Sequence, residues 1–444
     1  MRAIVAALAL LMHAAVAGAD PQWVRTLGVD DGFCEFGVRS VEQTSDGGYV
    51  LAGWVEDCST VDRDAWIAKL DTNGALLWQK SYGGNADDEA TVLRRTTDGG
   101  FLLAGVTKSF ADPDGDFWCV RLDSNGKVKW QKSYGGKNEE WLYSAEQTSD
   151  GGFILVGRAE DVTPATGQDA WCVRINSTGG LVWERSYGGI YPDAAFSVVQ
   201  AADGGFAFVG WSDTAETTGM DAWLAKTNSS GTLEWVKSYD GGTDHDDGFY
   251  ALRPADDGGY LAAGFTRRLF STDGGAWFVR LDSAGALLWQ RRIGKTLDRL
   301  SAVRETSDGF ILAGTTSSYG SGYDEDFTGI KIDKLGNILW ARRYGGTWDE
   351  GASAVQPTRD AGFILAGTSP SFTGGDDQGL AIRLSASGTI STCTKFAKSF
   401  SRRPATPATT IWDTTFVTGL VKPTVKGTKA KTATATAVTA TPCK

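Results

Sequence analysis

A short motif, Asp-Gly-Gly followed by an aromatic residue, recurs along almost the whole chain at a nearly constant spacing. The seven copies, of which the last two are degenerate, begin at Asp46, Asp98, Asp150, Asp203, Asp257, Asp308 and Asp360. The steps between them are 51 to 54 residues. A period of this kind marks a repeat architecture, in which each repeat is one supersecondary unit. The chain is therefore expected to fold as seven similar units.

Each unit has the pattern of four short strands. In the second unit the strands are expected at residues 90–97, 101–107, 117–123 and 127–134, which are rich in aliphatic and aromatic residues and bounded by Gly, Asp, Asn or Ser. The Asp-Gly-Gly segment joins the first two as a tight hairpin, because glycine adopts positive φ without penalty. Four-stranded units of this length, repeated in series, are typical of β-propellers. The sequence predicts an all-β, seven-bladed β-propeller.

A tryptophan in the fourth strand indicates how the ring closes. Six units carry it in phase, at Trp78, Trp130, Trp183, Trp235, Trp289 and Trp340. A seventh, Trp23, precedes the first turn, whereas the last unit has GTIST at the corresponding place. We therefore expect the N-terminal strand to complete the last blade, which ties the two ends together and removes an open sheet edge.

Two further positions recur in phase with the blades. A basic residue closes the third strand of every unit, at Lys69, Arg121, Arg174, Lys226, Arg280, Lys331 and Arg383. Five units also have a third-strand tryptophan, at Trp66, Trp118, Trp171, Trp223 and Trp277. Recurrence in phase predicts that these rings pack between blades, where each buries about 150–250 Å².

The ends of the chain differ from the repeats. Residues 1–19 combine one Arg, an apolar core and an Ala-Gly-Ala site before Asp20, which is the pattern of a secretory signal peptide. The apolar run is too short for a membrane span. We assign residues 20–392 to the propeller and 393–444 to a Thr/Ala/Lys-rich basic tail. The mature protein is expected to be extracellular or periplasmic.

The tail and the propeller have opposite charges. Nine Lys or Arg and one Asp follow Cys393, whereas the whole chain carries a net charge of −11, so the propeller body is near −20. We expect the tail to dock partly on this body, with its Thr-rich segments forming strands. The alternative is a disordered or envelope-facing tail. The acidic body argues against a nucleic-acid partner.

Four of the six cysteines are candidates for disulfides, which persist in exported proteins. Cys34 and Cys58 fall in loops at the same face of one blade, and a bridge between them is expected. A second bridge, Cys393–Cys443, would fix the tail to the end of the last blade.

Groups for nucleophilic or histidine-based chemistry are scarce. Cys119 and Cys172 occupy one third-strand position in successive blades, where most other units have apolar residues, so we expect buried free thiols. His13 is removed with the signal peptide, and His245 is expected to be a solvated loop residue. A histidine metal cluster is excluded, and a Ser-His-Asp site would depend on one residue. We assign no catalytic residue, metal ligand or resident cofactor.

Acidic residues provide a candidate site. Ten residues before the turn, six units carry a carboxylate, at Asp88, Glu140, Asp193, Asp247, Asp298 and Glu350. Phe36 is the exception. These side chains should encircle one face, where the favoured explanation is structural: they accept backbone N–H bonds or pair with the recurring basic residues. The alternatives are binding of a cation such as Ca²⁺, or glycan chemistry carried out by a carboxylate pair.

Two tryptophans that do not recur in every unit are candidates for stacking on a ligand. Trp54 and Trp211 follow the second-strand glycine, at the start of a loop. Their position at a propeller face suits ligand binding better than the in-phase rings, and simple loop packing is the alternative.

The units resemble the tandem repeats of secreted bacterial and archaeal β-propeller proteins, which are mostly uncharacterised. The resemblance rests on SYGG, DDEA, TSDGG and LDTNGALLWQKSYGG and covers residues 20–392. Some of those proteins are labelled endoglucanase or lectin-like. LDTNGALLW is also similar to the tryptophan-docking motif of quinoprotein dehydrogenases. This chain has seven units in place of eight and no adjacent Cys-Cys pair, which argues against a quinone cofactor.

These features favour an exported, monomeric, non-enzymatic binding module. Its partner would be an extracellular polysaccharide or an envelope protein, held by loops on one propeller face, because loops can vary while the ring stays rigid. One alternative is an endoglucanase-like glycoside hydrolase that uses paired funnel carboxylates. A second alternative is a structural scaffold of the cell envelope.

Overall fold

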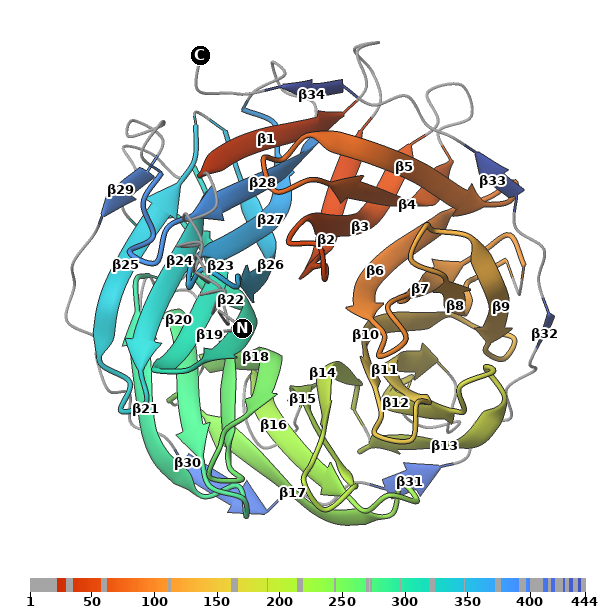
Figure 1. Cartoon of the computed structure of the whole chain (residues 1–444). Helices are drawn as coiled ribbons and strands as arrows, with labels where there is room; N and C mark the ends of the chain where they lie inside the picture. The colour runs from red at the N-terminus through yellow and green to blue at the C-terminus, as the bar shows by residue number, and fades with distance from the viewer. Residues whose placement is uncertain are drawn as a thin grey trace, which may run out of the picture.

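The computed structural model shows a closed ring of seven β-sheets (Figure 1). It describes residues 22–28, 35–56, 62–110, 113–160, 167–189, 191–213, 219–242, 245–268, 271, 274–295, 297–318, 324–346, 348–371 and 377–390. It also describes the backbone of 397–399, 410–413, 417–419, 426–427, 431–433 and 438–440. Within these residues, no helix is long and apolar enough to cross a membrane.

Blades 1 to 4 each contain four consecutive antiparallel strands. Blade 1 is β2 (Phe36–Gln43), β3 (Tyr49–Glu56), β4 (Arg63–Leu70) and β5 (Leu76–Gly83). Blade 2 is β6 (Asp88–Arg95), β7 (Phe101–Thr107), β8 (Asp116–Leu122) and β9 (Val128–Tyr134). Blade 3 is β10 (Glu140–Gln147), β11 (Phe153–Glu160), β12 (Gln168–Ile175) and β13 (Leu181–Gly188). Blade 4 is β14 (Asp193–Gln200), β15 (Phe206–Asp213), β16 (Met220–Thr227) and β17 (Leu233–Asp240).

Blades 5 and 6 follow the same order, and blade 7 joins the two ends of the propeller. Blade 5 is β18 (His245–Pro254), β19 (Tyr260–Arg268), β20 (Gly274–Leu281) and β21 (Leu287–Ile293). Blade 6 is β22 (Arg299–Thr306), β23 (Gly309–Thr316), β24 (Asp326–Asp333) and β25 (Ile338–Tyr344). Blade 7 is β26 (Gly351–Pro357), β27 (Phe363–Ser369), β28 (Gln378–Leu384) and β1 (Trp23–Gly28).

The predicted closure of the ring is confirmed. β1 pairs antiparallel with β28, from Trp23 opposite Arg383 to Leu27 opposite Gly379. The guanidinium of Arg383 also donates through Nε to the hydroxyl of Tyr49 in blade 1 at 2.7 Å. The last blade is therefore bound both to the N-terminal strand and to the first blade.

Each blade holds its neighbour through the fourth-strand aromatic residues. In blade 2 the indole of Trp130 donates to the Ser177 carbonyl at 3.1 Å, and the hydroxyl of Tyr134 donates to the Gly179 carbonyl at 2.8 Å. Both acceptors lie in the hairpin between the third and fourth strands of blade 3. Equivalent tyrosine bonds to the next hairpin are made by Tyr82, Tyr187, Tyr239 and Tyr344. The five third-strand tryptophans are fully buried, so the predicted packing between blades is confirmed.

The recurring basic residue pairs with the turn aspartate of its own blade. Lys69 lies 2.7 Å from Asp46, and Lys226 lies 2.6 Å from Asp203. The other five blades repeat the pair, as Arg121–Asp98, Arg174–Asp150, Arg280–Asp257, Lys331–Asp308 and Arg383–Asp360. Each basic side chain is buried beneath the hairpin, so the pair fixes the first turn to the third strand.

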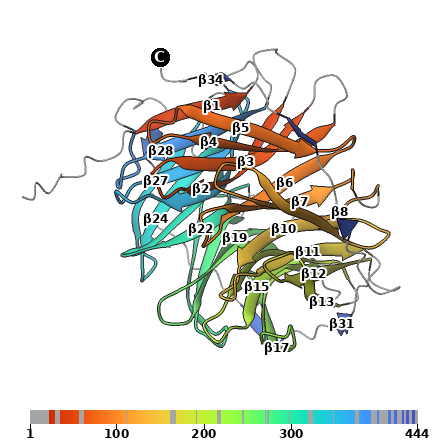
Figure 2. The same ribbon diagram turned by 45° about the vertical axis from the view of Figure 1, so that its right-hand side comes forward.

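Among the described residues, the basic tail adds a fifth strand to six of the seven blades. β34 (Val438–Ala440) pairs with β1, β33 (Lys431–Ala433) with β5, and β32 (Lys426–Gly427) with β9. β31 (Val417–Gly419) pairs with β13, β30 (Thr410–Asp413) with β17, and β29 (Ala397–Ser399) with β25. Figure 2 shows β31 and β34 on the outer side of the ring. The tail therefore runs round the circumference and covers outer strand edges, as partial docking predicted.

We predict that Asp360→Ala destabilises the protein strongly. Arg383 is fully buried and the Asp360 side chain is 17% exposed, so the substitution leaves a buried guanidinium without its carboxylate. The expected loss is about 3 kcal/mol of unfolding free energy, measured by urea denaturation. Asp98→Ala is the matched control and should cost less, because Asp98 is 48% exposed and water screens its pair. Equal losses in the two variants would contradict this account.

We also predict that removal of residues 393–444 exposes the fourth strands unequally. Amides of β5, β9, β13, β17 and β25 that face the tail should exchange hydrogen faster, because their partner strands are gone. β21 is an internal control, since it pairs with no tail strand in the described part of the chain. Hydrogen-exchange mass spectrometry checks this, and unchanged exchange in β5 and β17 would show that the tail does not protect these edges.

Candidate functional site

Each innermost strand bulges toward the axis of the ring at the same repeat position. The pairing with the second strand shifts register around one residue, for example between Leu142 and Ser144, so that Tyr143 is left over. Bulges of this type re-aim a side chain. The seven bulged residues are Arg39, Thr91, Tyr143, Phe196, Tyr250, Ser301 and Ser353. All of them line one pocket in the central channel.

The recurring second-strand glycine permits this bulge. A Cβ on Gly105 would lie 1.9 Å from the Glu89 carbonyl oxygen of the facing strand, where no side chain fits. The corresponding glycine of every other blade meets the first strand equally closely, at 2.0 Å or less; these are Gly53, Gly157, Gly210, Gly264, Gly314 and Gly367. The reason for a glycine at this position is therefore the close approach of two backbones.

The bulged residues form what we call the aromatic chamber, a pocket of 380 Å³. It is lined by Arg39, Glu89, Thr91, Trp141, Tyr143, Phe196, Tyr250, Arg299, Ser301 and Ser353. The rings lie together on adjacent blades: Tyr143 and Phe196 are 4.5 Å apart, and Phe196 and Tyr250 are 5.1 Å apart. The chamber therefore has one aromatic wall and one polar wall.

The charged groups of the aromatic chamber are mostly engaged with neighbours. Arg299 makes two hydrogen bonds to the Glu325 carboxylate, at 3.0 and 2.8 Å. Glu89 accepts from Arg63 at 2.9 Å. Ser301 and Ser353 add hydroxyl groups from blades 6 and 7. The polar wall thus presents oriented donors and acceptors around the axis.

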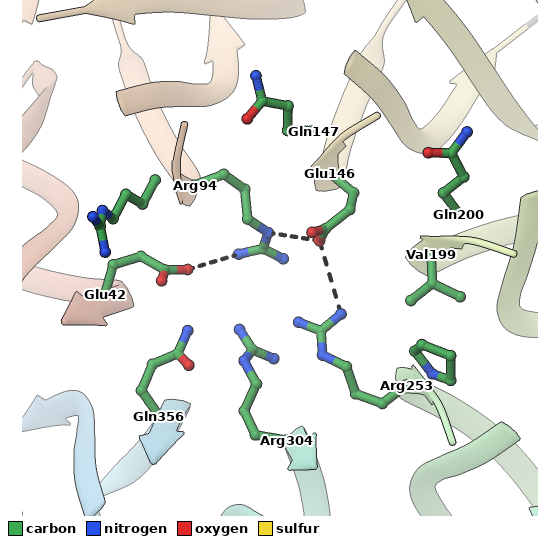
Figure 3. A pocket seen from close by; sticks show the side chains of 11 residues that line it. Glu42, Arg94, Glu146, Gln147, Val199, Gln200, Arg253, Arg304 and Gln356 are labelled. Atoms are coloured by element: carbon green, nitrogen blue, oxygen red, sulfur yellow. Dashed lines mark hydrogen bonds and ion pairs between the residues drawn. The ribbon is translucent and has the colours of Figure 1, made fainter. Parts of the chain in front are cut away.

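A second channel pocket, which we call the arginine chamber, has a volume of 460 Å³. Its lining comes from the ends of the innermost strands and comprises Glu42, Arg94, Arg95, Glu146, Gln147, Val199, Gln200, Arg253, Pro254, Arg304 and Gln356. Figure 3 shows three guanidinium groups pointing into it, those of Arg94, Arg253 and Arg304. Arg94 lies 3.1 Å from Glu146 and 3.9 Å from Glu42, and Arg253 lies 3.9 Å from Glu146.

The six predicted carboxylates do encircle one end of the ring, and all are buried. Each accepts a hydrogen bond from a backbone N–H just after the fourth strand, such as Gly84 to Asp88 at 2.7 Å and Gly136 to Glu140 at 3.0 Å. Asp193, Asp247, Asp298 and Glu350 accept from Gly189, Gly241, Lys295 and Gly346. These bonds agree with the structural explanation favoured from the sequence. A ligand-binding role for the six residues stays a prediction.

One of these carboxylates belongs to a buried acidic cluster. Asp221, Asp240 and Asp247 each place an oxygen within 4.8 Å of the others. Burial raises the pKa of Asp247 well above its usual range, and the nearby Asp240 and Asp221 add to the rise. Oxygen ligands of this kind suit a hard cation such as Ca²⁺.

The two tryptophans singled out from the sequence lie in different surroundings. Trp54 is only 4% exposed, and the guanidinium of Arg63 covers its ring at 4.1 Å from the centroid. Trp211 is half-buried and stacks beside Phe196, with centroids 6.2 Å apart and an interplanar angle of 35°. Trp211 thus lies beside Phe196 of the aromatic wall without lining the chamber, whereas Trp54 offers little open surface. Their roles in ligand binding stay predictions.

The histidine and cysteine expectations have different outcomes. His245 is not a solvated loop residue: it begins β18, is buried, and its Nδ1 lies 2.9 Å from the Thr266 hydroxyl. Cys119 and Cys172 are buried free thiols, as expected. Residues 1–19 and the four cysteines of the expected bridges, Cys34, Cys58, Cys393 and Cys443, lie outside the described residues. The described part of the chain contains no disulfide.

The sequence reasoning missed the residues that line the channel, although a signal was present. The bulged residues stand seven positions before the turn aspartate in every unit. Seven residues that line the arginine chamber stand four positions before it, namely Glu42, Arg94, Glu146, Val199, Arg253, Arg304 and Gln356. Both positions vary between units while their neighbours repeat, which is the pattern expected of a surface that binds a ligand on a constant scaffold.

We predict that Asp193→Asn stabilises the protein increasingly as pH rises. Burial raises the pKa of Asp193 to about 7, so the folded state keeps a proton that the unfolded chain releases near pH 4. Stability is therefore lost as pH rises from about 4 to 7. The asparagine removes this loss, with a gain at pH 8 of at most about 4 kcal/mol. Urea denaturation from pH 4 to 8 checks this against Asp324→Asn, an exposed carboxylate of blade 6 that serves as the control. A gain that does not change with pH would contradict the prediction.

Comparisons with known proteins assign no family to this chain. No protein-family model matches the chain, and no curated protein sequence matches it. Among solved structures it is similar to Sqt1 from Chaetomium thermophilum, with 12% identity, a TM-score of 0.45, and coverage of 83% of this chain and 99% of that one. It is also similar to a member of the DUF4221 family from Bacteroides vulgatus, with 9% identity, a TM-score of 0.37, and coverage of 86% of this chain and 100% of that one. A third similar structure is a putative exo-β-1,3-galactanase from Bifidobacterium bifidum, with 12% identity, a TM-score of 0.30, and coverage of 67% of this chain and 96% of that one.

Proposed function

We propose that the protein is an exported, non-enzymatic binding module that holds an extracellular glycan at the aromatic chamber. The observation that carries the proposal is the arrangement of that chamber, in which the bulged Tyr143, Phe196 and Tyr250 form one wall. A ring scaffold with variable residues turned into a concave channel is the default geometry of a binding site.

The two walls of the aromatic chamber match the two kinds of surface on a sugar ring. The C–H face of a sugar packs on aromatic side chains, which supply large apolar area with little conformational entropy. Its hydroxyl groups need donors and acceptors, which Arg39, Arg299, Ser301 and Ser353 supply across the channel. This division of surfaces favours a glycan over an envelope protein as the partner.

The described carboxylates give less support to the hydrolase alternative. Glycoside hydrolysis by a carboxylate pair needs two acids that face the substrate. Among the described residues that line the aromatic chamber, Glu89 is the one carboxylate, and it is paired with Arg63. The ring of six acids is turned toward backbone amides instead. We therefore favour binding without cleavage. A purely structural scaffold would not account for a pocket lined by variable aromatic and polar residues.

Export remains part of the proposal because of the sequence at the N-terminus. Residues 1–19 have the pattern of a secretory signal peptide. An exported protein would meet polysaccharides outside the cell. We expect the mature protein to act as a monomer, because the ring closes within one chain and tail strands pair with the outer edges of six blades among the described residues.

We predict that Trp141→Ala weakens glycan binding at least tenfold. Trp141 is half-buried at the chamber, and loss of a stacking ring in a binding site costs about 1.4 kcal/mol or more. The test is retention of purified mature protein on a panel of soluble polysaccharides, with affinities from calorimetry. Reducing-end release is recorded in the same samples.

Trp348→Ala is the matched control, because Trp348 is 52% exposed and does not line the chamber. Its binding should equal that of the wild type. Failure to retain any polysaccharide would remove the glycan proposal. Reducing-end release that Glu89→Gln abolishes would make the protein a hydrolase and overturn the binding-module account.

A further inference from the structure

The arginine chamber carries more positive than negative charge in an otherwise acidic protein. Its inward layer contains three guanidinium groups, from Arg94, Arg253 and Arg304, and two carboxylates, from Glu42 and Glu146. Arg95 adds a further positive charge to the lining. The whole chain carries −11, so this local excess of cations is not a consequence of composition.

The two carboxylates are shared by only two of the three guanidinium groups. Arg94 pairs with both acids and Arg253 with Glu146. Arg304 donates through Nη1 to the Val303 carbonyl at 3.0 Å, and it makes no ion pair with any described residue. Figure 3 shows its guanidinium beside that of Arg253, across the pocket from Arg94 and Glu42.

A bound anion would stabilise this arrangement. Burial lowers the pKa of Arg304, and the neighbouring Arg253 and Arg94 lower it further. Bringing several guanidinium groups together in a low-dielectric space costs free energy that a paired anion would offset. Their planar forks are suited to the oxygens of phosphate and carboxylate groups.

We propose that the arginine chamber binds a compact oxyanionic group of a small molecule, held by Arg94, Arg253 and Arg304. The group is a phosphate or a carboxylate, since both present oxygens to a guanidinium fork in the same way. The pocket of 460 Å³ accommodates a monosaccharide-sized molecule that bears such a group. This site is separate from the aromatic chamber, and the proposal does not depend on glycan binding there.

Calorimetric titration of the full-length mature protein at low ionic strength tests the proposal. The probes are inorganic phosphate, galacturonate as a carboxylate-bearing sugar, and galactose as the neutral control. Phosphate or galacturonate should bind and galactose should not bind at this site. Binding of phosphate alone would identify a tetrahedral anion, and binding of galacturonate alone would identify a sugar acid; either result supports the proposal.

Three variants separate an anion site from a structural network. Arg304→Gln should weaken anion binding at least tenfold, because it removes the guanidinium that makes no ion pair with a described carboxylate and is available to an anion. Glu42→Gln should strengthen binding severalfold, because it removes a competing carboxylate. Lys127→Gln, which removes an exposed positive charge from a hairpin of blade 2, should leave the affinity within twofold of the wild type.

A purely structural role for these arginines predicts different results. No binding of either anion at millimolar concentration would overturn the proposal, as would equal affinities in the wild type and Arg304→Gln. If Arg304→Gln fails to fold, Arg304→Lys replaces it, because lysine keeps the charge and removes the planar fork. The proposal would then be contradicted if the anion affinities of Arg304→Lys and of Glu42→Gln both equalled that of the wild type.

Discussion

The docking of each blade on the next is the interaction on which the rest of the structure depends. A four-stranded sheet of this size buries too little surface to be stable alone, so each blade relies on its neighbours. The fourth-strand tyrosine and tryptophan bind carbonyl groups of the adjacent hairpin, as Trp130 and Tyr134 do on blade 3. Because the contact repeats around the ring and the N-terminal strand completes blade 7, the seven weak units become one rigid scaffold.

The rigid ring permits an irregular inner surface. A bulge interrupts every innermost strand, and a glycine on the facing strand leaves room for the two backbones to approach closely there. The bulged side chains are thereby turned into the channel, where they vary between blades from Arg39 to Phe196 to Ser353. The scaffold positions and the variable positions are thus separated within a single strand, which is what a binding protein needs.

Much of the fold could be predicted from the sequence, because it depends on local repetition. The spacing of the Asp-Gly-Gly turns gave the number of blades, and the displaced Trp23 gave the closing strand. The sequence also located the recurring basic residues, but not their partners, because the fold brings Arg383 to Asp360 across two strands. The predicted first strand of blade 2 began at residue 90, whereas β6 begins at Asp88, so the acid lies inside the strand.

The candidate site was harder to predict, because it depends on register and on contacts across the ring. A bulge appears only when two strands are paired, so Tyr143 and Phe196 could not be recognised as neighbours from their separation in sequence. Arg94 and Arg253 are 159 residues apart in the chain and meet only because the ring closes. The burial of His245 likewise follows from the extension of β18 into a segment that the sequence places in a loop.

The central claim is that the inside of the ring, and not its outer surface, binds the ligand. Oxidative footprinting with a retained polysaccharide tests this most directly, because it reports the solvent access of individual aromatic side chains. The account predicts protection of Trp141 and Tyr143 in the channel, with no change at the exposed Trp348. Protection at Trp348 with none at Trp141 and Tyr143 would contradict it and place the ligand outside the channel.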